Sequence, residues 1–245
     1  MIFEERLDVI LDTLNKEKKI SNKDLIKKLE VSESTLRRDL DYLVEDGKIK
    51  RVHGGAVLNI EAEELSFDTN ELTNPTSKRE IAKKAASLVE DKMVIFLDGG
   101  STCNLVIDYL RGKDIRVVTH GLMHMAKLME NNIPTTLLGG DIKVKTKVSL
   151  GLVTLDQLSN YSFDIAFLGA NGYDKDYYYT ADINEAILKK TAAKLSEKAY
   201  ILADSSKENL VYHARICKKD ECELIREDKW FIHLRLIHPL TILWD

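Results

Sequence analysis

Five short apolar runs, separated by segments of helical periodicity, constrain the fold of this chain more than any other feature. They cover residues 93–97, 116–119, 135–138, 165–168 and 199–203. Strands that are apolar along nearly their whole length are typical of parallel sheets with helices on both faces. The sequence therefore predicts an α/β fold, with a mainly parallel, Rossmann-like sheet, for the larger part of the chain.

Glycine and polar residues follow each of the five runs, at the strand ends where ligands bind in open α/β sheets. The clusters are Asp98-Gly99-Gly100-Ser101-Thr102, Thr119-His120-Gly121, Gly139-Gly140, Gly169-Ala170-Asn171-Gly172 and Asp204-Ser205-Ser206-Lys207. In the first cluster, the glycines let backbone N–H groups approach an anion, and Ser101 and Thr102 open a helix whose N-terminus attracts phosphate. A single glycine after a strand is ordinarily just a turn. Five clusters at successive strand ends favour a binding site for a phosphorylated polyol.

The N-terminal part has a different pattern, in which a helix is expected to begin after Ser32. Ser32 is suited to cap the free N–H groups of that helix. An apolar side follows at helical spacing, made by Leu36, Leu40, Tyr42 and Leu43. Four side chains are then expected to point outward: Ser34, Thr35, Arg37 and Arg38. Hydroxyl and guanidinium groups in such positions contact phosphates or base edges, and two preceding helical segments with a tight turn complete a helix-turn-helix.

A strand-like stretch at 48–52 and the glycines after it indicate a hairpin wing. Two adjacent glycines, Gly54 and Gly55, suit a tip that approaches a sugar-phosphate backbone closely. Lys50, Arg51 and His53 are the candidate contacts to the DNA backbone or minor groove.

Composition limits the remaining possibilities. The chain has 245 residues, 44% of them hydrophobic, which is enough for two globular domains. The net charge of −4 belongs to the larger part, because residues 1–57 hold 12 basic and 12 acidic residues, and a DNA-binding surface needs only one positive face. The spacing of Cys103, Cys217 and Cys222 predicts no metal site, and no other cofactor is indicated. Without an apolar span or signal-peptide pattern, we expect no membrane partner and a cytoplasmic location.

Loss of periodicity between residues 58 and 76 indicates a linker. We therefore expect a winged helix-turn-helix domain at 1–57, a linker at 58–76, and an effector-binding and oligomerisation domain at 77–245.

On these features the chain resembles the DeoR family of bacterial transcriptional regulators. The matching positions of the first domain are Arg6, Ile10, Leu14, Ser32, Thr35, Leu36, Arg37, Arg38, Asp39 and Leu40, with 50–56 in the wing. Those of the second domain are 98–102, 138–140, Ser149, Gly151, 167–170, Glu185, Ala186, Lys189 and 204–207. The resemblance implies that the third helix enters the major groove. It also implies that the second domain is similar to the ribose-5-phosphate isomerase and glucosamine-6-phosphate deaminase group.

The predicted DNA-binding residues are Ser32, Ser34, Thr35, Arg37, Arg38, Lys50, Arg51, His53, Gly54 and Gly55. Asp39 is interpreted as structural, because a carboxylate facing phosphates would repel them unless it pairs internally with an arginine. The strand-end glycines and the resemblance together give the predicted effector-binding residues: Asp98, Gly99, Gly100, Ser101, Thr102, Thr119, Gly139, Gly140, Gly169, Glu185, Lys189 and Lys207. By the resemblance, Lys207 is expected to neutralise a phosphate or to meet a ring oxygen of the sugar. Glu185 and Lys189, one helical turn apart, alternatively form an ordinary surface ion pair.

Together with these features, the resemblance implies a repressor of a sugar-metabolism operon, whose affinity for double-stranded DNA changes when a phosphorylated sugar binds the second domain. We expect a homo-dimer or larger homo-oligomer, because one small reading head makes few base contacts. The alternative is a sugar-phosphate isomerase or deaminase with an accessory DNA-binding head, in which Asp98 or Glu185 would move a proton; no catalytic residue is assigned. Several features depart from the family pattern. His120 stands where Asn is common, and Tyr179 stands where Gly commonly precedes the matching threonine. The linker around Ser66-Phe67 lacks a common arginine, and the end of the chain from about residue 223 differs from the usual closing strand.

Overall fold

A computed structural model describes residues 1–17, 19–58 and 64–228 of the chain. Its N-terminal part contains three helices, α1 (Phe3–Glu17), α2 (Asn22–Leu29) and α3 (Glu33–Glu45). An antiparallel sheet of three strands packs beside them, in the order β1 (Lys19–Ser21), β3 (Gly55–Leu58), β2 (Ile49–Val52). The helix-turn-helix and its wing are as expected from the sequence, and β1 is an addition that the sequence did not indicate.

Capping and burial explain where the helices of this domain lie. The side chains of Ser21 and Ser32 accept hydrogen bonds from backbone N–H groups at the starts of α2 and α3, which confirms Ser32 as a cap. Leu36, Leu40 and Leu43 are buried in the core, but Tyr42 is 48% exposed. The assignment of Tyr42 to the apolar side of the helix was wrong, because its ring packs edge-on against Phe3 at the surface instead.

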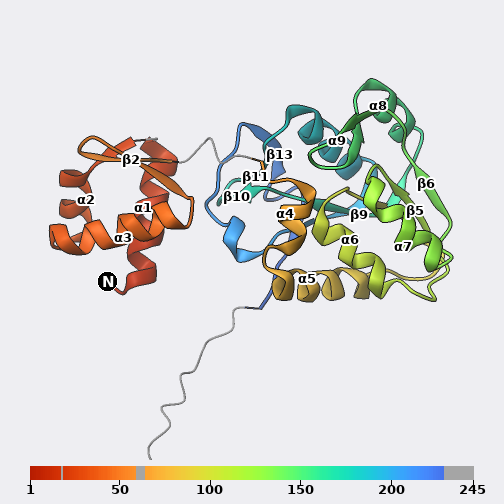
Figure 1. The fold of residues 1–245 in the computed structure, drawn as a ribbon, viewed down its shortest axis with the longest axis horizontal. Helices are drawn as coiled ribbons and strands as arrows, with labels where there is room; N and C mark the ends of the chain where they lie inside the picture. The colour runs from red at the N-terminus through yellow and green to blue at the C-terminus, as the bar shows by residue number, and fades with distance from the viewer. Residues whose placement is uncertain (18, 59–63, 229–245) are drawn as a thin grey trace, which may run out of the picture.

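The larger part of the chain is built on a sheet of six parallel strands (Figure 1). Their order is β14 (Glu223–Ile225), β12 (Ser196–Leu202), β9 (Phe163–Gly169), β4 (Val94–Leu97), β5 (Arg116–Thr119), β6 (Thr135–Leu137). The five apolar runs of the sequence supply five of these strands, and β14 adds an edge. The expected mainly parallel α/β sheet is confirmed.

Side chains of the central strands alternate between two cores, so helices cover both faces of the sheet. Ile95 and Leu97 pack with α5 (Pro75–Ser87), α6 (Ser101–Val106) and α7 (Met125–Glu130). Phe96 points the other way, into the core formed with α8 (Leu152–Leu158) and α9 (Ile183–Lys194). Three short 3₁₀ turns, η1 (Ile107–Tyr109), η2 (Leu122–His124) and η3 (Ser205–Lys207), complete the connections.

Two smaller sheets lie beside the main one. The hairpin of β7 (Asp141–Lys143) and β8 (Val148–Leu150) follows β6. A three-stranded antiparallel sheet contains β10 (Gly172–Tyr173), β11 (Tyr177–Thr180) and β13 (Ala214–Lys218).

The segment assigned to the linker contains a helix, α4 (Phe67–Leu72). Ser66 caps this helix and Phe67 is buried, so one capped turn and one aromatic anchor suffice where no helical periodicity is visible. At the other end of the chain, residues 223–225 form β14, and the divergent end beyond residue 228 lies outside the described residues. Among the residues that are described, no helix is both long and apolar enough to cross a membrane.

Candidate functional site

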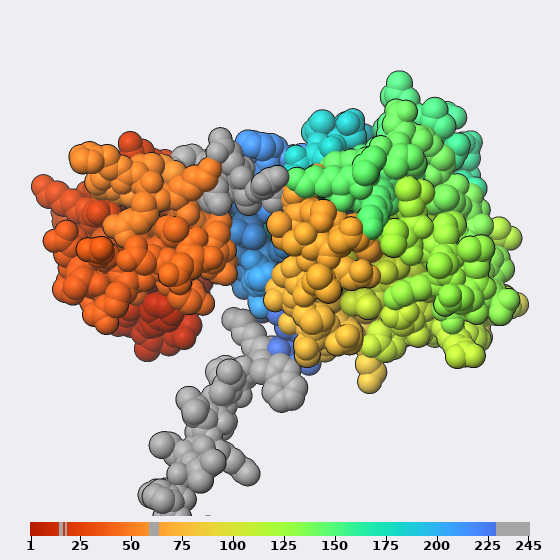
Figure 2. All heavy atoms as spheres, viewed as in Figure 1, coloured from red at the N-terminus to blue at the C-terminus, as the bar shows by residue number. Residues whose placement is uncertain are grey.

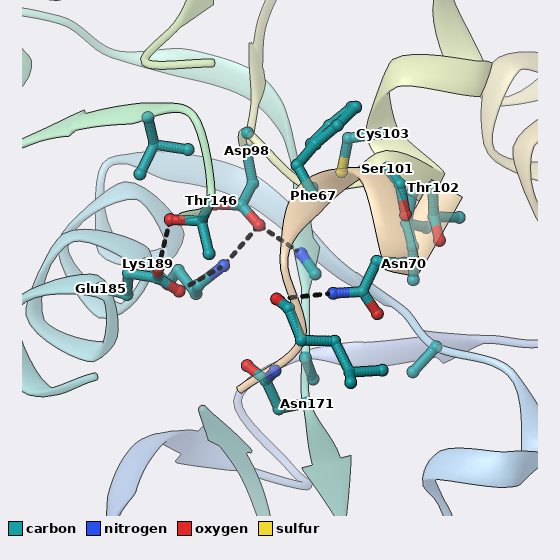
Figure 3. Close-up of a pocket in the computed structure, with 18 of the residues that line it drawn as sticks. Phe67, Asn70, Asp98, Ser101, Thr102, Cys103, Thr146, Asn171, Glu185 and Lys189 are labelled. Atoms are coloured by element: carbon teal, nitrogen blue, oxygen red, sulfur yellow. Dashed lines mark hydrogen bonds and ion pairs between the residues drawn. The ribbon is translucent and has the colours of Figure 1, made fainter. Parts of the chain in front are cut away.

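A cavity opens at the carboxyl ends of β4, β9 and β12, where strand-end loops meet α4, α5 and α9 (Figure 3). Its polar lining includes Glu64, Asn70, Lys78, Asp98, Ser101, Thr102, His120, Thr146, Asn171, Glu185, Lys189, Asp204 and Lys207. Figure 3 shows Ser101 and Thr102 on one side of the cavity, with Glu185 and Lys189 on the opposite side. The lining therefore has a hydroxyl-rich side and a side that carries charged groups.

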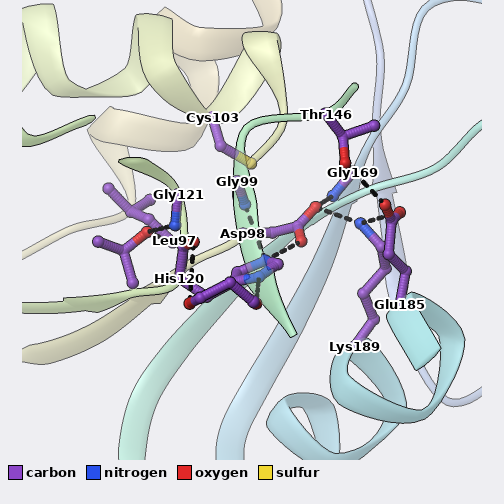
Figure 4. A network of polar contacts seen from close by, with 12 residues as sticks. Leu97, Asp98, Gly99, Cys103, His120, Gly121, Thr146, Gly169, Glu185 and Lys189 are labelled. Atoms are coloured by element: carbon purple, nitrogen blue, oxygen red, sulfur yellow. Dashed lines mark hydrogen bonds and ion pairs between the residues drawn. The ribbon is translucent and has the colours of Figure 1, made fainter. Parts of the chain in front are cut away.

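Asp98 lies at the centre of a buried polar network (Figure 4). One carboxylate oxygen contacts Nε2 of His120 at 2.9 Å, and the other accepts from the N–H of Gly169 at 2.7 Å and from the ammonium of Lys189. Burial by itself would raise the pKa of Asp98, but the charge of Lys189 and the bond with His120 outweigh it and hold this pKa below its ordinary value. Asp98 is thus an anion that positions Lys189 and His120.

Glu185 and Lys189 form the charged side together. Both side chains are buried, at 6% and 5% exposed, so the interpretation of them as a surface ion pair was wrong. The Glu185 carboxylate accepts hydrogen bonds from the hydroxyls of Thr180 and Thr146, at 3.1 and 3.3 Å. Burial lowers the pKa of Lys189, but the carboxylates of Asp98 and Glu185 outweigh it and raise this pKa, so Lys189 is a cation.

Two further lysines lie near the hydroxyl-rich side. Lys78 of α5 is 3% exposed, and its ammonium donates to the hydroxyl of Ser101 at 3.1 Å and to the carbonyl of Asn70. Burial lowers its pKa to about 8, and the charge of Lys207 contributes in the same direction. The pKa of Lys207 is also lowered by burial. The lowered pKa values show that nearby carboxylates do not fully offset the burial of these two lysines. Together with the two hydroxyls, the lysines are suited to bind an anion such as phosphate.

Nine of the twelve predicted effector-binding residues line this cavity: Asp98, Gly99, Gly100, Ser101, Thr102, Gly169, Glu185, Lys189 and Lys207. Thr119, Gly139 and Gly140 do not, which corrects the prediction for these three. The Thr119 hydroxyl donates to the carbonyl of Leu97 and is fully buried. The N–H of Gly139 donates to Gln157, and Gly140 packs against Thr154. Gly139 and Gly140 thus contact α8, and Thr119 bonds within the main sheet, so none of the three is part of the cavity lining.

The sequence prediction missed Lys78, Phe67, Asn70 and Thr146, which line the cavity from α4, α5 and the β7–β8 loop. None of these residues follows a strand of the main sheet, and that position was the signal used to find the site. In the described parts of the chain, no group of His, Cys, Asp and Glu side chains is arranged to hold a metal ion.

The predicted DNA-binding residues lie on α3 and the wing. Ser32, Ser34, Arg37, Arg38, Lys50, Arg51, His53 and Gly54 are exposed, and Thr35 is half-buried. Asp41 of α3 connects the two elements, because its carboxylate lies 2.7 Å from Nη1 of Arg51 in the wing and 3.8 Å from Nε of Arg37 on α3. Asp39 is buried and paired with both Nε and Nη2 of Arg6, at 2.7 and 2.9 Å, which confirms its structural interpretation.

Gly55 corrects one interpretation of the wing. It is buried, and a Cβ at this position would lie 2.1 Å from the carbonyl oxygen of Ile20 in β1. Gly55 is therefore required for the close approach of β3 to β1, not for an approach to DNA. Gly54 has a φ of +76° with open space around it, so its role is to form the turn.

The chain is similar to several known proteins. The chain is 41% identical over 213 residues to the uncharacterized HTH-type transcriptional regulator FruR of Bacillus subtilis strain 168, covering 84% of each. It is 30% identical over 229 residues to a lactose phosphotransferase system repressor of Staphylococcus epidermidis, covering 91% of each. Among solved structures, ribose 5-phosphate isomerase A of Methanocaldococcus jannaschii matches 56% of this chain and 55% of its own, at 24% identity and a TM-score of 0.42.

Two family models match in the order of the two domains. The DeoR-like helix-turn-helix domain matches residues 6–62, and the DeoR C terminal sensor domain matches residues 73–229. Because the relatives are named as regulators of transcription, the comparisons support a regulator over the isomerase or deaminase alternative. The chain belongs to the DeoR family of transcriptional regulators.

Proposed function

We propose that this regulator represses a sugar-metabolism operon and that a phosphorylated sugar, bound in the cavity, changes its affinity for the operator. The observation that carries the proposal is the two-sided lining of the cavity. Lys78, Lys207 and the hydroxyl of Ser101 provide a site for a phosphate. On the other side, the carboxylate of Glu185 can accept hydrogen bonds from sugar hydroxyls, and the amide of Asn171 can donate to them or accept from them.

Operator binding is assigned to α3 and the wing. Arg37 and Arg38 reach base edges or phosphates from the exposed side of α3, and Arg51 and His53 contact the backbone from the wing. Asp41 holds Arg51 in the free protein, and DNA phosphates replace it as the partner. The sugar phosphate acts by binding one arrangement of the two domains better than the other, which shifts the population that binds DNA.

We also propose the domain division 1–57, 58–76 and 77–245, and self-association into a dimer or larger oligomer. Pairs of helix-turn-helix heads read two half-sites, so a second copy supplies the second head. Exposed aliphatic side chains on three neighbouring elements of the sensor domain support this: Ile142, Val144, Leu152, Val153, Ile183 and Ile187. Monomeric surfaces seldom expose that many together.

The test is titration of the full chain onto the DNA upstream of its own gene, at fixed salt, with a panel of sugar phosphates. The panel holds fructose 1-phosphate, fructose 6-phosphate, glucose 6-phosphate and ribose 5-phosphate. We expect one of them to change the operator dissociation constant at least about fivefold. Lys207→Met should remove that response and leave operator binding, whereas Arg37→Ala should weaken operator binding itself. Operator binding that no sugar phosphate alters would contradict the assignment of the cavity.

A further inference from the structure

The segment that connects the two domains forms part of the cavity wall. Glu64, Leu65, Phe67 and Asn70 line the cavity, and all four lie between the wing and α5 in the chain. Phe67 is 3% exposed, and the carbonyl of Asn70 accepts from the ammonium of Lys78. A ligand in the cavity therefore lies beside the stretch of chain that leads to the DNA-binding domain.

The loop of the β7–β8 hairpin holds this segment. The backbone N–H of Phe67 donates to the carbonyl of Lys145 at 2.9 Å, and the ammonium of Lys147 lies 2.5 Å from the Asp68 carboxylate. Figure 2 shows the hairpin region, in green, against the orange surface that contains α4. At the end of the segment that is nearer in sequence to the wing, Nζ of Lys143 lies 2.8 Å from Oε1 of Glu64.

Lys143 connects this last contact to the cavity. Its Nζ also lies 3.0 Å from Oδ2 of Asp182, the cap of α9, and 3.0 Å from Oε1 of Glu185. One ammonium thus serves three carboxylates, although Lys143 is not itself part of the cavity lining. The three carboxylates repel one another, and the same cation stabilises all of them. When the cation moves closer to one carboxylate, its contacts with the others weaken. A change at Glu185 therefore alters how firmly Lys143 holds Glu64.

We propose that Lys143 transmits effector binding from the cavity to the DNA-binding domain. It acts as a positioning residue, because it touches Glu185 in the cavity and Glu64 on the connecting segment at once. Sugar hydroxyls that donate to Glu185 weaken its hold on Lys143, and Lys143 then shifts toward Glu64 and repositions the segment. The inference rests on the proposed function, since it requires a polyol ligand at Glu185.

The experiment measures a coupling ratio, defined as the operator dissociation constant with a saturating sugar phosphate divided by that without it. The probe is the member of the panel that changes wild-type affinity most, used at a concentration set by each variant's own affinity for it. Allosteric ratios typically lie between about 5 and 150. For Lys143→Met we expect a ratio within about twofold of one, with the sugar phosphate still bound. Lys143→Arg, which keeps the charge, should restore most of the wild-type ratio.

Lys127→Met is the matched control, because Lys127 is 29% exposed, pairs with Asp108 at 2.9 Å and lies outside the cavity lining. It should keep the wild-type ratio. Glu64→Gln removes the carboxylate that pairs with Lys143 on the connecting segment, and should bring the ratio close to one as Lys143→Met does. The double variant should show no further change. If Lys143→Met does not fold, Glu64→Gln replaces it. Retention of the wild-type ratio in Lys143→Met, or in Glu64→Gln where it replaces that variant, overturns the inference. A wild-type ratio of one for the whole panel rejects the proposed function, and the inference with it.

Discussion

Asp98 and Lys78 are both buried in the cavity wall, but their surroundings stabilise the charged form of Asp98 and disfavour the charged form of Lys78. Asp98 accepts from the N–H of Gly169 and the ammonium of Lys189 and contacts Nε2 of His120, and its pKa is held below its ordinary value. The hydrogen-bond partners of Lys78, a carbonyl and a hydroxyl, are neutral, and burial lowers its pKa to about 8. An anionic ligand would therefore stabilise the ammonium of Lys78, whereas the carboxylate of Asp98 already has its hydrogen-bond and charge partners.

The lowered pKa of Lys78 predicts that sugar-phosphate binding weakens in alkaline solution. Below about pH 8 the ammonium is present in the empty cavity, and above it the amine predominates. A phosphate dianion favours the charged form, so binding above pH 8 requires uptake of a proton. The dissociation constant should rise up to about tenfold per pH unit for each lysine that must gain a proton. Calorimetric titration of the full chain between pH 7 and 9.5, without DNA, measures this dependence.

The control is Lys78→Arg, because a guanidinium keeps its proton throughout this range. This variant should show a flatter profile above pH 8 than the wild type. If the wild-type affinity for the sugar phosphate stays constant up to pH 9.5, Lys78 does not contact the phosphate.

At the scale of elements, the wing depends on the close approach of β3 to β1. Gly55 pairs with Ser21, and any side chain at Gly55 meets the carbonyl of Ile20. Gly55→Ala should therefore destabilise the N-terminal domain by about 1–3 kcal/mol, through overpacking. Thermal unfolding of the full chain, followed alongside the salt dependence of operator binding, tests this. The slope of affinity against salt should stay at its wild-type value, because no phosphate contact is lost.

His53→Ala serves as the comparison, because His53 is exposed at the tip of the wing. It should leave the unfolding temperature within a few degrees of the wild type. If Gly55→Ala unfolds at the wild-type temperature but binds the operator with a smaller salt slope, Gly55 contacts DNA and its packing role is wrong.

Elements with a clear period or cap were predictable from the sequence, and the others were not. The run at 165–168 and the helix after Ser32 were visible because burial imposes a pattern over several residues. β1 has three residues, of which only Ile20 is buried, so it leaves no recognisable alternation. In helix α4 likewise only Phe67 is buried, and its six residues resemble a polar linker.

The cavity could be predicted only where it is built from strand ends. Asp98 follows β4 and Gly169 ends β9, and these two strands are adjacent in the sheet, so the proximity of the two residues follows from topology. Lys78 precedes its partner Ser101 by 23 residues and lies on another helix, and nothing in its local sequence distinguishes it from an exposed lysine. Thr119 was wrongly included, because the side chain of the last residue of a strand can turn back toward a neighbouring strand, as its bond to Leu97 shows.

At the scale of the whole molecule, one surface of the sensor domain is unusually apolar. Val144, Leu152 and Ile183 are 80%, 85% and 61% exposed. The elements that carry them lie together, because β8 and α9 both contact α8, and Lys143 bridges the end of β7 to the start of α9. This surface is on the side of the sheet covered by α8 and α9, next to the connecting segment held by Lys143. A second copy bound here would lie close to the part of the chain that leads to the DNA-binding domain.

Replacing Leu152 and Ile183 together by Asp should therefore shift the full chain toward the monomer. Charges buried in an interface without partners are strongly unfavourable, whereas the same charges on an exposed surface cost little, so folding should be preserved. Light scattering coupled to size exclusion would show the lower mass, and operator affinity should fall because a single head meets a paired site. Met129→Asp is the matched control, since Met129 is 70% exposed on α7, which packs on the other face of the sheet. An unchanged mass in the double variant, with Met129→Asp also unchanged, would place the self-association surface elsewhere.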